Sequence, residues 1–120
     1  MAEILIIDDE PAIRRLLVRV LRKAGHTTHE ASNGDEGIEL FHQVHPELVI
    51  TDIVMPDMEG IEMIRKLRQA APTLPILAIS GSGTPLYLRA ATGLGATAAL
   101  AKPFDIAELL SVVGHLLETV

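Results

Sequence analysis

Five polar residues in this sequence follow short apolar runs, and their side chains are suited to binding a metal ion and a phosphate group. They are Asp8, Asp9, Asp52, Ser80 and Lys102. Three carboxylates held close together repel one another, so that at least one tends to stay protonated unless a cation is present. One Mg²⁺ ion and the lysine ammonium would balance the three negative charges, and Mg²⁺ accepts carboxylate, water and phosphate oxygens. The residue types therefore predict a Mg²⁺ site that leaves positions for a phosphate group, rather than a closed Ca²⁺ site.

Asp52 is the candidate nucleophile of this group. An aspartate can attack phosphorus to form an aspartyl phosphate, while a divalent ion and a nearby lysine neutralise the phosphoryl oxygens. Asp52 lies between the acidic pair and Lys102 along the chain, whereas Asp8 and Asp9 are adjacent and precede a predicted helix. We therefore expect Asp52 to take the phosphoryl group, and Asp8 and Asp9 to bind the metal ion.

The apolar runs that precede these residues predict strands. They are too short for helices and, early in the chain, rich in β-branched residues, which is typical of buried strands. The predicted buried strands cover residues 4–7, 48–50, 76–79 and 98–100. A weaker segment at residues 26–31 alternates polar and small side chains, as expected for a strand at the edge of a sheet. Functional groups of open parallel sheets gather beyond the carboxyl ends of the strands, so the five polar groups are expected on one rim.

Helical periods separate the predicted strands. The clearest apolar stripe runs through residues 13–24, with Pro11 in the first turn and Gly25 at the end. A similar stripe covers residues 106–117, where Asp105 can cap the first turn. Weaker periods occur at residues 38–44, 61–67 and 87–94. Strands that alternate with helices predict an α/β fold with a parallel sheet covered on both faces.

The composition fits one domain that covers residues 1–120. A chain of 120 residues with 48% hydrophobic and 22% charged residues can enclose a core without disulfides. Two Phe, one Tyr and a net charge of −6 disfavour nucleic-acid binding, which needs exposed rings or positive charge. The absence of cysteine, of an apolar run of membrane-spanning length and of a secretion signal predicts a cytoplasmic location without membrane contact.

Four motifs resemble the receiver domains of two-component response regulators, of the chemotaxis-regulator type. They are ILIIDDEP at residues 4–11, DIVMPDMEG at 52–60, SG at 80–81 and KPF at 102–104. The motifs occur in the order typical of that family, and the resemblance covers essentially the whole chain. It implies a doubly wound, flavodoxin-like fold with five helices around a five-stranded parallel sheet of order 2-1-3-4-5.

The resemblance also implies roles for the acidic residues. Asp52 would be the phosphoacceptor and a metal ligand. Asp8 and Asp9 would hold Mg²⁺ directly or through water. The backbone carbonyl of Val54 would supply a further ligand. These roles agree with those expected from charge alone.

The lysine and serine motifs are expected to carry the response to phosphorylation. By the resemblance, Lys102 pairs with the phosphoryl oxygens and the Ser80 hydroxyl moves to hydrogen-bond them. The bond between Lys102 and Pro103 is a candidate cis peptide. One position departs from the family: Ala99 stands where a Tyr or Phe usually lies three residues before the lysine. We therefore expect a muted or rerouted conformational response.

The resemblance implies partners rather than substrates. A sensor histidine kinase or a phosphotransfer protein would donate the phosphoryl group, and small donors such as acetyl phosphate serve some family members. The signal would pass to a downstream protein or a covalently linked output domain, neither of which the sequence identifies. We expect no enzyme activity beyond self-catalysed phosphoryl transfer and hydrolysis of the aspartyl phosphate. The chain is expected to be a stand-alone regulator or part of a longer protein, and a monomer or a weak phosphorylation-linked dimer.

Three other functions fit parts of this sequence. A protein-interaction module with the same fold that acts independently of phosphorylation is the main alternative, because of Ala99. A phosphohydrolase of the haloacid dehalogenase type would need a second carboxylate where Val54 stands. A flavodoxin would need a hydroxyl-rich phosphate loop in place of Asp8, Asp9 and Glu10, whose charges repel phosphate.

Overall fold

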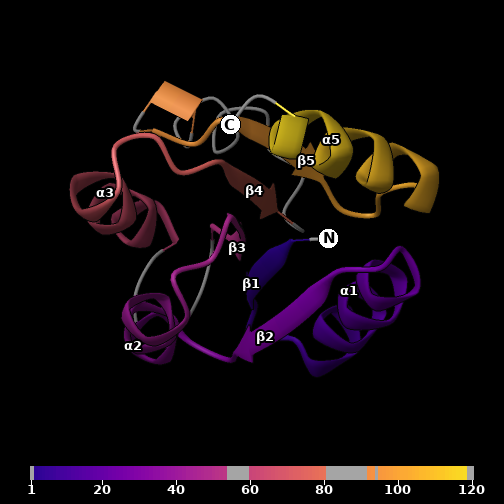
Figure 1. Cartoon of the computed structure of the whole chain (residues 1–120), viewed down its shortest axis with the longest axis horizontal. Coiled ribbons are helices and arrows are strands. Elements are labelled where there is room, and N and C mark those ends of the chain that lie inside the picture. The colour runs from indigo at the N-terminus through magenta and orange to yellow at the C-terminus, as the bar shows by residue number, and fades with distance from the viewer. Residues whose placement is uncertain (1, 54–59, 81–91, 94, 119–120) are drawn as a thin grey trace.

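Five parallel strands form one sheet in the computed structural model, which describes residues 2–53, 60–80, 92–93 and 95–118 (Figure 1). The strands are β1 (Glu3–Ile7), β2 (Thr27–Ala31), β3 (Leu48–Asp52), β4 (Ile76–Ser80) and β5 (Ala98–Ala101). Their order is β2-β1-β3-β4-β5, and every neighbouring pair is parallel. The predicted α/β fold and strand order are therefore confirmed.

Helices cover both faces of the sheet. They are α1 (Pro11–Lys23), α2 (Gly34–Val44), α3 (Gly60–Ala70) and α5 (Ile106–Glu118). Figure 1 shows α1 and α5 on one side of the sheet and α2 and α3 on the other. The described part of the chain thus contains four of the five predicted helices. Tyr87, Ala91 and Leu94, which suggested the fifth, lie outside the described residues.

Alternate residues of the central strand β1 serve two separate cores. Ile4 and Ile6 pack in the cluster beneath α1 and α5, whereas Leu5 and Ile7 pack in the cluster beneath α2 and α3. All four side chains are fully buried. A strand that is apolar on both faces is stable only between two layers of helices, which explains the continuous apolar run in the sequence.

The helix ends follow the local signals in the sequence. Pro11 occupies the first position of α1, and Gly25, just beyond its end, has a φ of +100°, which favours glycine. The Asp105 carboxylate accepts a hydrogen bond of 3.0 Å from the backbone N–H of Ala107 and so caps α5 as predicted. Within the described residues, no helix has both the length and the apolar character that crossing a membrane would require.

Helix α2 approaches the sheet closely at Gly37. A Cβ atom added there would lie 2.6 Å from Cδ1 of Ile7 and 3.3 Å from Cε of Met63. Ile7 and Met63 are fully buried, so neither side chain can move aside into solvent. Glycine at this position therefore sets the distance between α2 and β1.

Gly37→Ala is expected to lower the free energy of unfolding by about 1–3 kcal/mol, because the added methyl group overpacks the core beside Ile7. Gly114→Ala is the matched control: it also lies inside a helix, but its Cβ would meet nothing within 4 Å. The control should be neutral or stabilising by up to about 1 kcal/mol, as helix propensity predicts. Urea unfolding of both variants measures the difference, and equal stabilities would contradict the close approach.

Candidate functional site

The candidate site lies at the carboxyl edge of the sheet, where the register brings distant residues together. Asp52 pairs with Ile79 across β3 and β4, and Ser80 pairs with Ala101 across β4 and β5. Asp8 follows β1 directly, and Lys102 follows β5. The parallel strands thus carry four of the predicted polar residues to one rim.

Lys102 is the centre of this group. Its Nζ lies 3.0 Å from Oδ2 of Asp8, 3.1 Å from Oδ2 of Asp52 and 3.0 Å from Oε1 of Glu10. The side chains of Asp8 and Asp52 are 0% and 6% exposed, and that of Lys102 is 8% exposed, whereas Glu10 is 56% exposed. Two nearly buried carboxylates therefore share one nearly buried ammonium, with a third carboxylate at the mouth of the site.

The main chain fixes the position of Lys102. Its backbone N–H donates a hydrogen bond of 2.7 Å to the carbonyl of Ser80. The peptide bond between Lys102 and Pro103 is cis, as the sequence analysis suggested. The main chain of Lys102 is thus fixed to the end of β4.

Asp8 is held at several atoms. Its N–H donates to the carbonyl of Ala31 at 3.1 Å, and its Oδ1 accepts from the N–H of Glu10 at 2.9 Å. Its carbonyl accepts from Nη1 of Arg14 at 2.7 Å. These contacts orient the carboxylate so that Oδ2 faces Lys102.

The charges in this site change the ionisation of its members. Burial raises the pKa of Asp8, and the Asp52 charge adds to this, while the Glu10 N–H and Lys102 oppose it. Burial alone would lower the pKa of Lys102, but its close contacts with Asp8 and Glu10 and the charges of Asp52 and Asp8 outweigh this effect and raise that pKa. Lys102 therefore stays protonated. Its single positive charge does not balance the three carboxylates of Asp8, Glu10 and Asp52.

The residues present fit a divalent cation. Carboxylate oxygens of Asp8, Glu10 and Asp52 lie within 4.8 Å of one another. Oδ2 of Asp8 is buried and accepts no hydrogen bond among the described residues, although it lies 3.0 Å from the Lys102 ammonium. When ionised, three carboxylates and one ammonium leave two negative charges, which one Mg²⁺ ion would balance.

The sequence predicted Asp9 as a metal ligand and did not single out Glu10, which the structure places beside Asp8 and Asp52. Asp9 is partly exposed and does not belong to the group of neighbouring carboxylates. Glu10 has extended backbone angles of φ −89° and ψ 111°. The chain bends at Asp9, between Asp8 and Glu10, and the Glu10 N–H donates to Oδ1 of Asp8. This local turn places the Glu10 carboxylate 3.0 Å from the Lys102 ammonium. Val54, the other expected ligand, lies outside the described residues.

Ser80 and Ala99 lie on neighbouring strands near the rim. Ser80 is fully buried at the end of β4. Ala99 pairs with Ala78 on β4 and packs against the cluster beneath α2 and α3, which also contains Ala78. Since alternate residues of a strand share a face, the Ser80 side chain points to that same side of the sheet. A methyl group thus stands near Ser80 where the family resemblance leads one to expect an aromatic ring.

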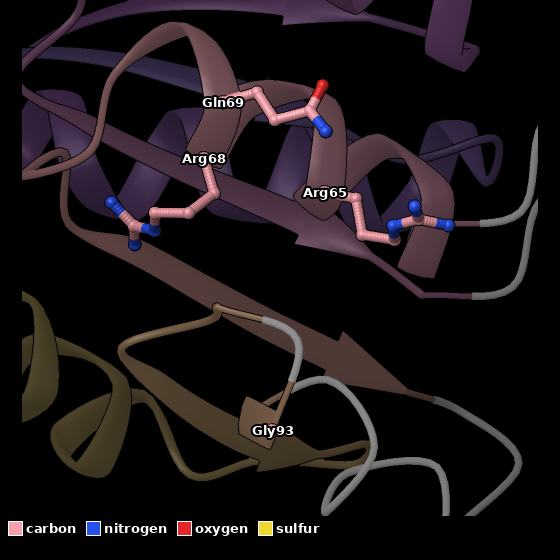
Figure 2. Close-up of a pocket in the computed structure, with 4 residues that line it drawn as sticks. All are labelled: Arg65, Arg68, Gln69 and Gly93. Atoms are coloured by element: carbon pink, nitrogen blue, oxygen red, sulfur yellow. The ribbon is translucent and has the colours of Figure 1, made fainter.

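A shallow hollow of about 290 Å³ on the side of α3 contains none of these residues. Figure 2 shows its lining residues Arg65, Arg68 and Gln69 spreading in different directions from α3. The Arg68 guanidinium donates to the carbonyls of Gly95 and Ala71, and so fastens the end of α3 to the segment before β5. The hollow is therefore separate from the group of charged residues around Lys102.

Comparison with known proteins shows the family of this chain. A family model described as the response regulator receiver domain matches residues 4–114. The chain is 33% identical to sporulation initiation phosphotransferase F of Bacillus subtilis, over 92% of this chain and 90% of that protein. A solved structure described as a response regulator from Chloroflexus aurantiacus has a TM-score of 0.93 and 32% identity, with 98% of both chains covered.

Other relatives are much longer. The chain is 34% identical to the sensor kinase CckA of Brucella abortus over 98% of its own length. It spans only 13–25% of the length of that kinase and of several transcriptional regulators. The shared region in these proteins is therefore one domain among others.

Asp8→Asn is expected to raise the free energy of unfolding of the Mg²⁺-free protein near neutral pH by about 1 kcal/mol, because it removes a buried charge that faces Asp52. The pKa of Asp8 is raised on folding from its ordinary value of 3.8, so the folded protein binds the proton more tightly than the unfolded chain. The wild type should therefore lose stability relative to the variant as the pH rises from 3.8 through the folded pKa, and the two should be similar below that range.

Urea unfolding with a chelator at several pH values measures this difference. Asp9→Asn is the control and should change little, because Asp9 is partly exposed and outside the carboxylate group. An Asp8→Asn protein less stable than wild type at neutral pH would mean that pairing with Lys102 outweighs the cost of burying the charge.

Proposed function

Since the chain belongs to the response regulator receiver family, we propose that it accepts a phosphoryl group on Asp52 in a Mg²⁺-dependent reaction and passes the change to a protein partner. The observation that carries this proposal is the buried Lys102 ammonium, 3.1 Å from Oδ2 of Asp52 and 3.0 Å from Oδ2 of Asp8. A cation in that position can neutralise an oxygen of a phosphoryl group attached to Asp52.

Asp52 is suited to the role of nucleophile. It ends a fully buried strand and is only 4% exposed, so the backbone holds the carboxylate at the rim with little freedom. An Asp52 oxygen would form a bond to phosphorus while the bond between phosphorus and the donor's leaving atom breaks, and the donor keeps that electron pair. Mg²⁺, when bound, would neutralise charge on the phosphoryl oxygens. Asp8 and Asp52, with Asp9 and Val54 by the family resemblance, are the proposed ligands, and Glu10 joins them because of its position.

Lys102 and Ser80 are proposed to bind the phosphoryl group on Asp52. Phosphorylation would add phosphoryl oxygens to an Asp52 oxygen near Lys102, and the ammonium would pair with one of these added oxygens. The Lys102 N–H is bonded to the Ser80 carbonyl at 2.7 Å, so the two residues are joined through the main chain. The Ser80 hydroxyl would then hydrogen-bond the phosphoryl group and shift the end of β4.

The relatives support a protein as donor. One is named a phosphotransferase and another a sensor kinase. We therefore propose a histidine kinase or a phosphotransfer protein as the donor, with acetyl phosphate as a small-molecule substitute. The recipient of the signal is proposed to be a separate protein or a linked output domain.

Incubation with acetyl phosphate and Mg²⁺ is expected to add one phosphoryl group to the wild type and none to Asp52→Asn, because the amide of Asn is not a nucleophile for this transfer. Intact mass spectrometry with and without Mg²⁺ measures the adduct, and its loss in hydroxylamine identifies an acyl phosphate. Asp35→Asn, an exposed position in the first turn of α2, is the control and should be phosphorylated like the wild type.

No adduct with Mg²⁺ and several donors would argue against the proposal and favour a receiver fold that binds partners without phosphorylation. An adduct that persists in Asp52→Asn would place the phosphoacceptor elsewhere.

Lys102→Ala is expected to accept the phosphoryl group but to lose the response at Ser80. The variant keeps the main-chain bond to Ser80 but lacks the ammonium that pairs with Asp52. Amide chemical shifts in NMR spectra of the phosphorylated and unphosphorylated proteins measure the response. In the wild type, the shift change at Ser80 should exceed that at Ala99, whose methyl group cannot rotate into a new packing position. Normal shift changes at Ser80 in Lys102→Ala would remove the lysine from the mechanism.

A further inference from the structure

We propose that Arg14 is a positioning residue for the metal site: it holds the main chain of Asp8, and Glu30 on the neighbouring strand holds Arg14. The inference rests on the proposed function, since it concerns how tightly the acidic group binds Mg²⁺. It assigns roles to two residues, on α1 and on β2, whose side chains lie outside the group of carboxylates around Lys102.

The contacts of Asp8 show what Arg14 contributes. One side of the Asp8 main chain is anchored by its N–H, which donates to Ala31 of β2 at 3.1 Å. The other side is anchored by its carbonyl, which accepts from Nη1 of Arg14 at 2.7 Å. Oδ1 is occupied by the Glu10 N–H, which leaves Oδ2 facing Lys102. Arg14 is therefore the side chain that fixes the carbonyl end of Asp8 where the chain leaves the sheet.

Arg14 is itself held in place. Its Nε lies 3.5 Å from Oε1 of Glu30 on β2, and the Arg14 side chain is only 18% exposed. A guanidinium has several donors in a rigid planar arrangement, so one group can bind a carbonyl and a carboxylate together. The Arg14 N–H also donates to the Glu10 carbonyl at 3.1 Å. The same residue thus ties both Asp8 and Glu10 to the first turn of α1.

Loss of the Arg14 guanidinium is expected to weaken Mg²⁺ binding and not to change the phosphoryl transfer step itself. Without the guanidinium, the Asp8 carbonyl loses its side-chain donor, and the Asp8 main chain keeps the bond of its N–H to Ala31. Groups that orient metal ligands typically change metal affinity by about 10–100-fold. We expect the low end of this range because Arg14 contacts the carbonyl of Asp8 and not its carboxylate.

The test compares Arg14→Gln, Arg14→Lys and the neighbouring Arg15→Gln, whose side chain is exposed. Isothermal titration calorimetry with Mg²⁺ alone gives the dissociation constant, and phosphorylation by acetyl phosphate over a range of Mg²⁺ concentrations gives a half-maximal concentration and a maximal rate. In Arg14→Gln both the dissociation constant and the half-maximal concentration should rise about tenfold, with the maximal rate within about threefold of wild type. Arg14→Lys should fall between, because lysine can donate to the Asp8 carbonyl but cannot also reach Glu30. Arg15→Gln should match the wild type.

Two results would overturn the proposal: Mg²⁺ affinity in Arg14→Gln equal to that in Arg15→Gln, or a loss of phosphorylation that saturating Mg²⁺ does not restore. If circular dichroism shows that Arg14→Gln is unfolded, Arg14→Lys and Glu30→Gln are compared instead. The Mg²⁺ affinity of each is expected to fall by roughly two- to threefold. Unchanged Mg²⁺ affinity in both variants would overturn the proposal. A wild type that binds Mg²⁺ but takes no phosphoryl group would defeat the proposed function alone, since the calorimetric comparison would still stand.

Discussion

The need to neutralise buried charge governs the structure of this protein around its site. Asp8 and Asp52 are almost completely buried, and buried carboxylates are tolerated only when a cation or a set of donors compensates them. Lys102 supplies the cation from a position 50 residues after Asp52 in the chain. Because the ammonium must reach two carboxylates at about 3 Å, β1, β3 and β5 have to end at one level.

A parallel sheet satisfies this condition because its strands all end on the same edge. The five strands are held at that level by two apolar cores, one on each face, and the apolar side chains of β1, β3 and β4 are buried in them. Burial of each large aliphatic side chain stabilises the folded state by about 1.5–3 kcal/mol. The core thus offsets the unfavourable placement of like charges at the rim, and that excess of negative charge is what makes the rim receptive to a divalent cation.

The turn after β1 connects the charged site to the rest of the molecule. It carries Asp8 and Glu10 into the site, and Arg14 and Glu30 hold it against α1 and the edge strand. On the opposite side, Lys102 is bonded through its main chain to Ser80, next to the strand that carries Ala99. Because position 99 carries only a methyl group, the proposed route for a change at Asp52 runs through the end of β4 and not through an aromatic ring on β5.

The sequence by itself determined the strands, the α/β class and the polar residues that end the strands, because apolar runs and helical periods are local properties of the chain. Motif resemblance added the strand order, which the structure confirms. Only the tertiary structure decided which carboxylates meet Lys102. Asp9 and Glu10 are equally acidic neighbours in the sequence, yet the folded chain brings Glu10 to 3.0 Å from the Lys102 ammonium and leaves Asp9 outside the group of neighbouring carboxylates. The contacts of Arg14 with Asp8 and Glu30 could not be predicted from the sequence either. These residues lie on a helix, at a strand end and on an edge strand, and they come within hydrogen-bond reach only after the chain has folded.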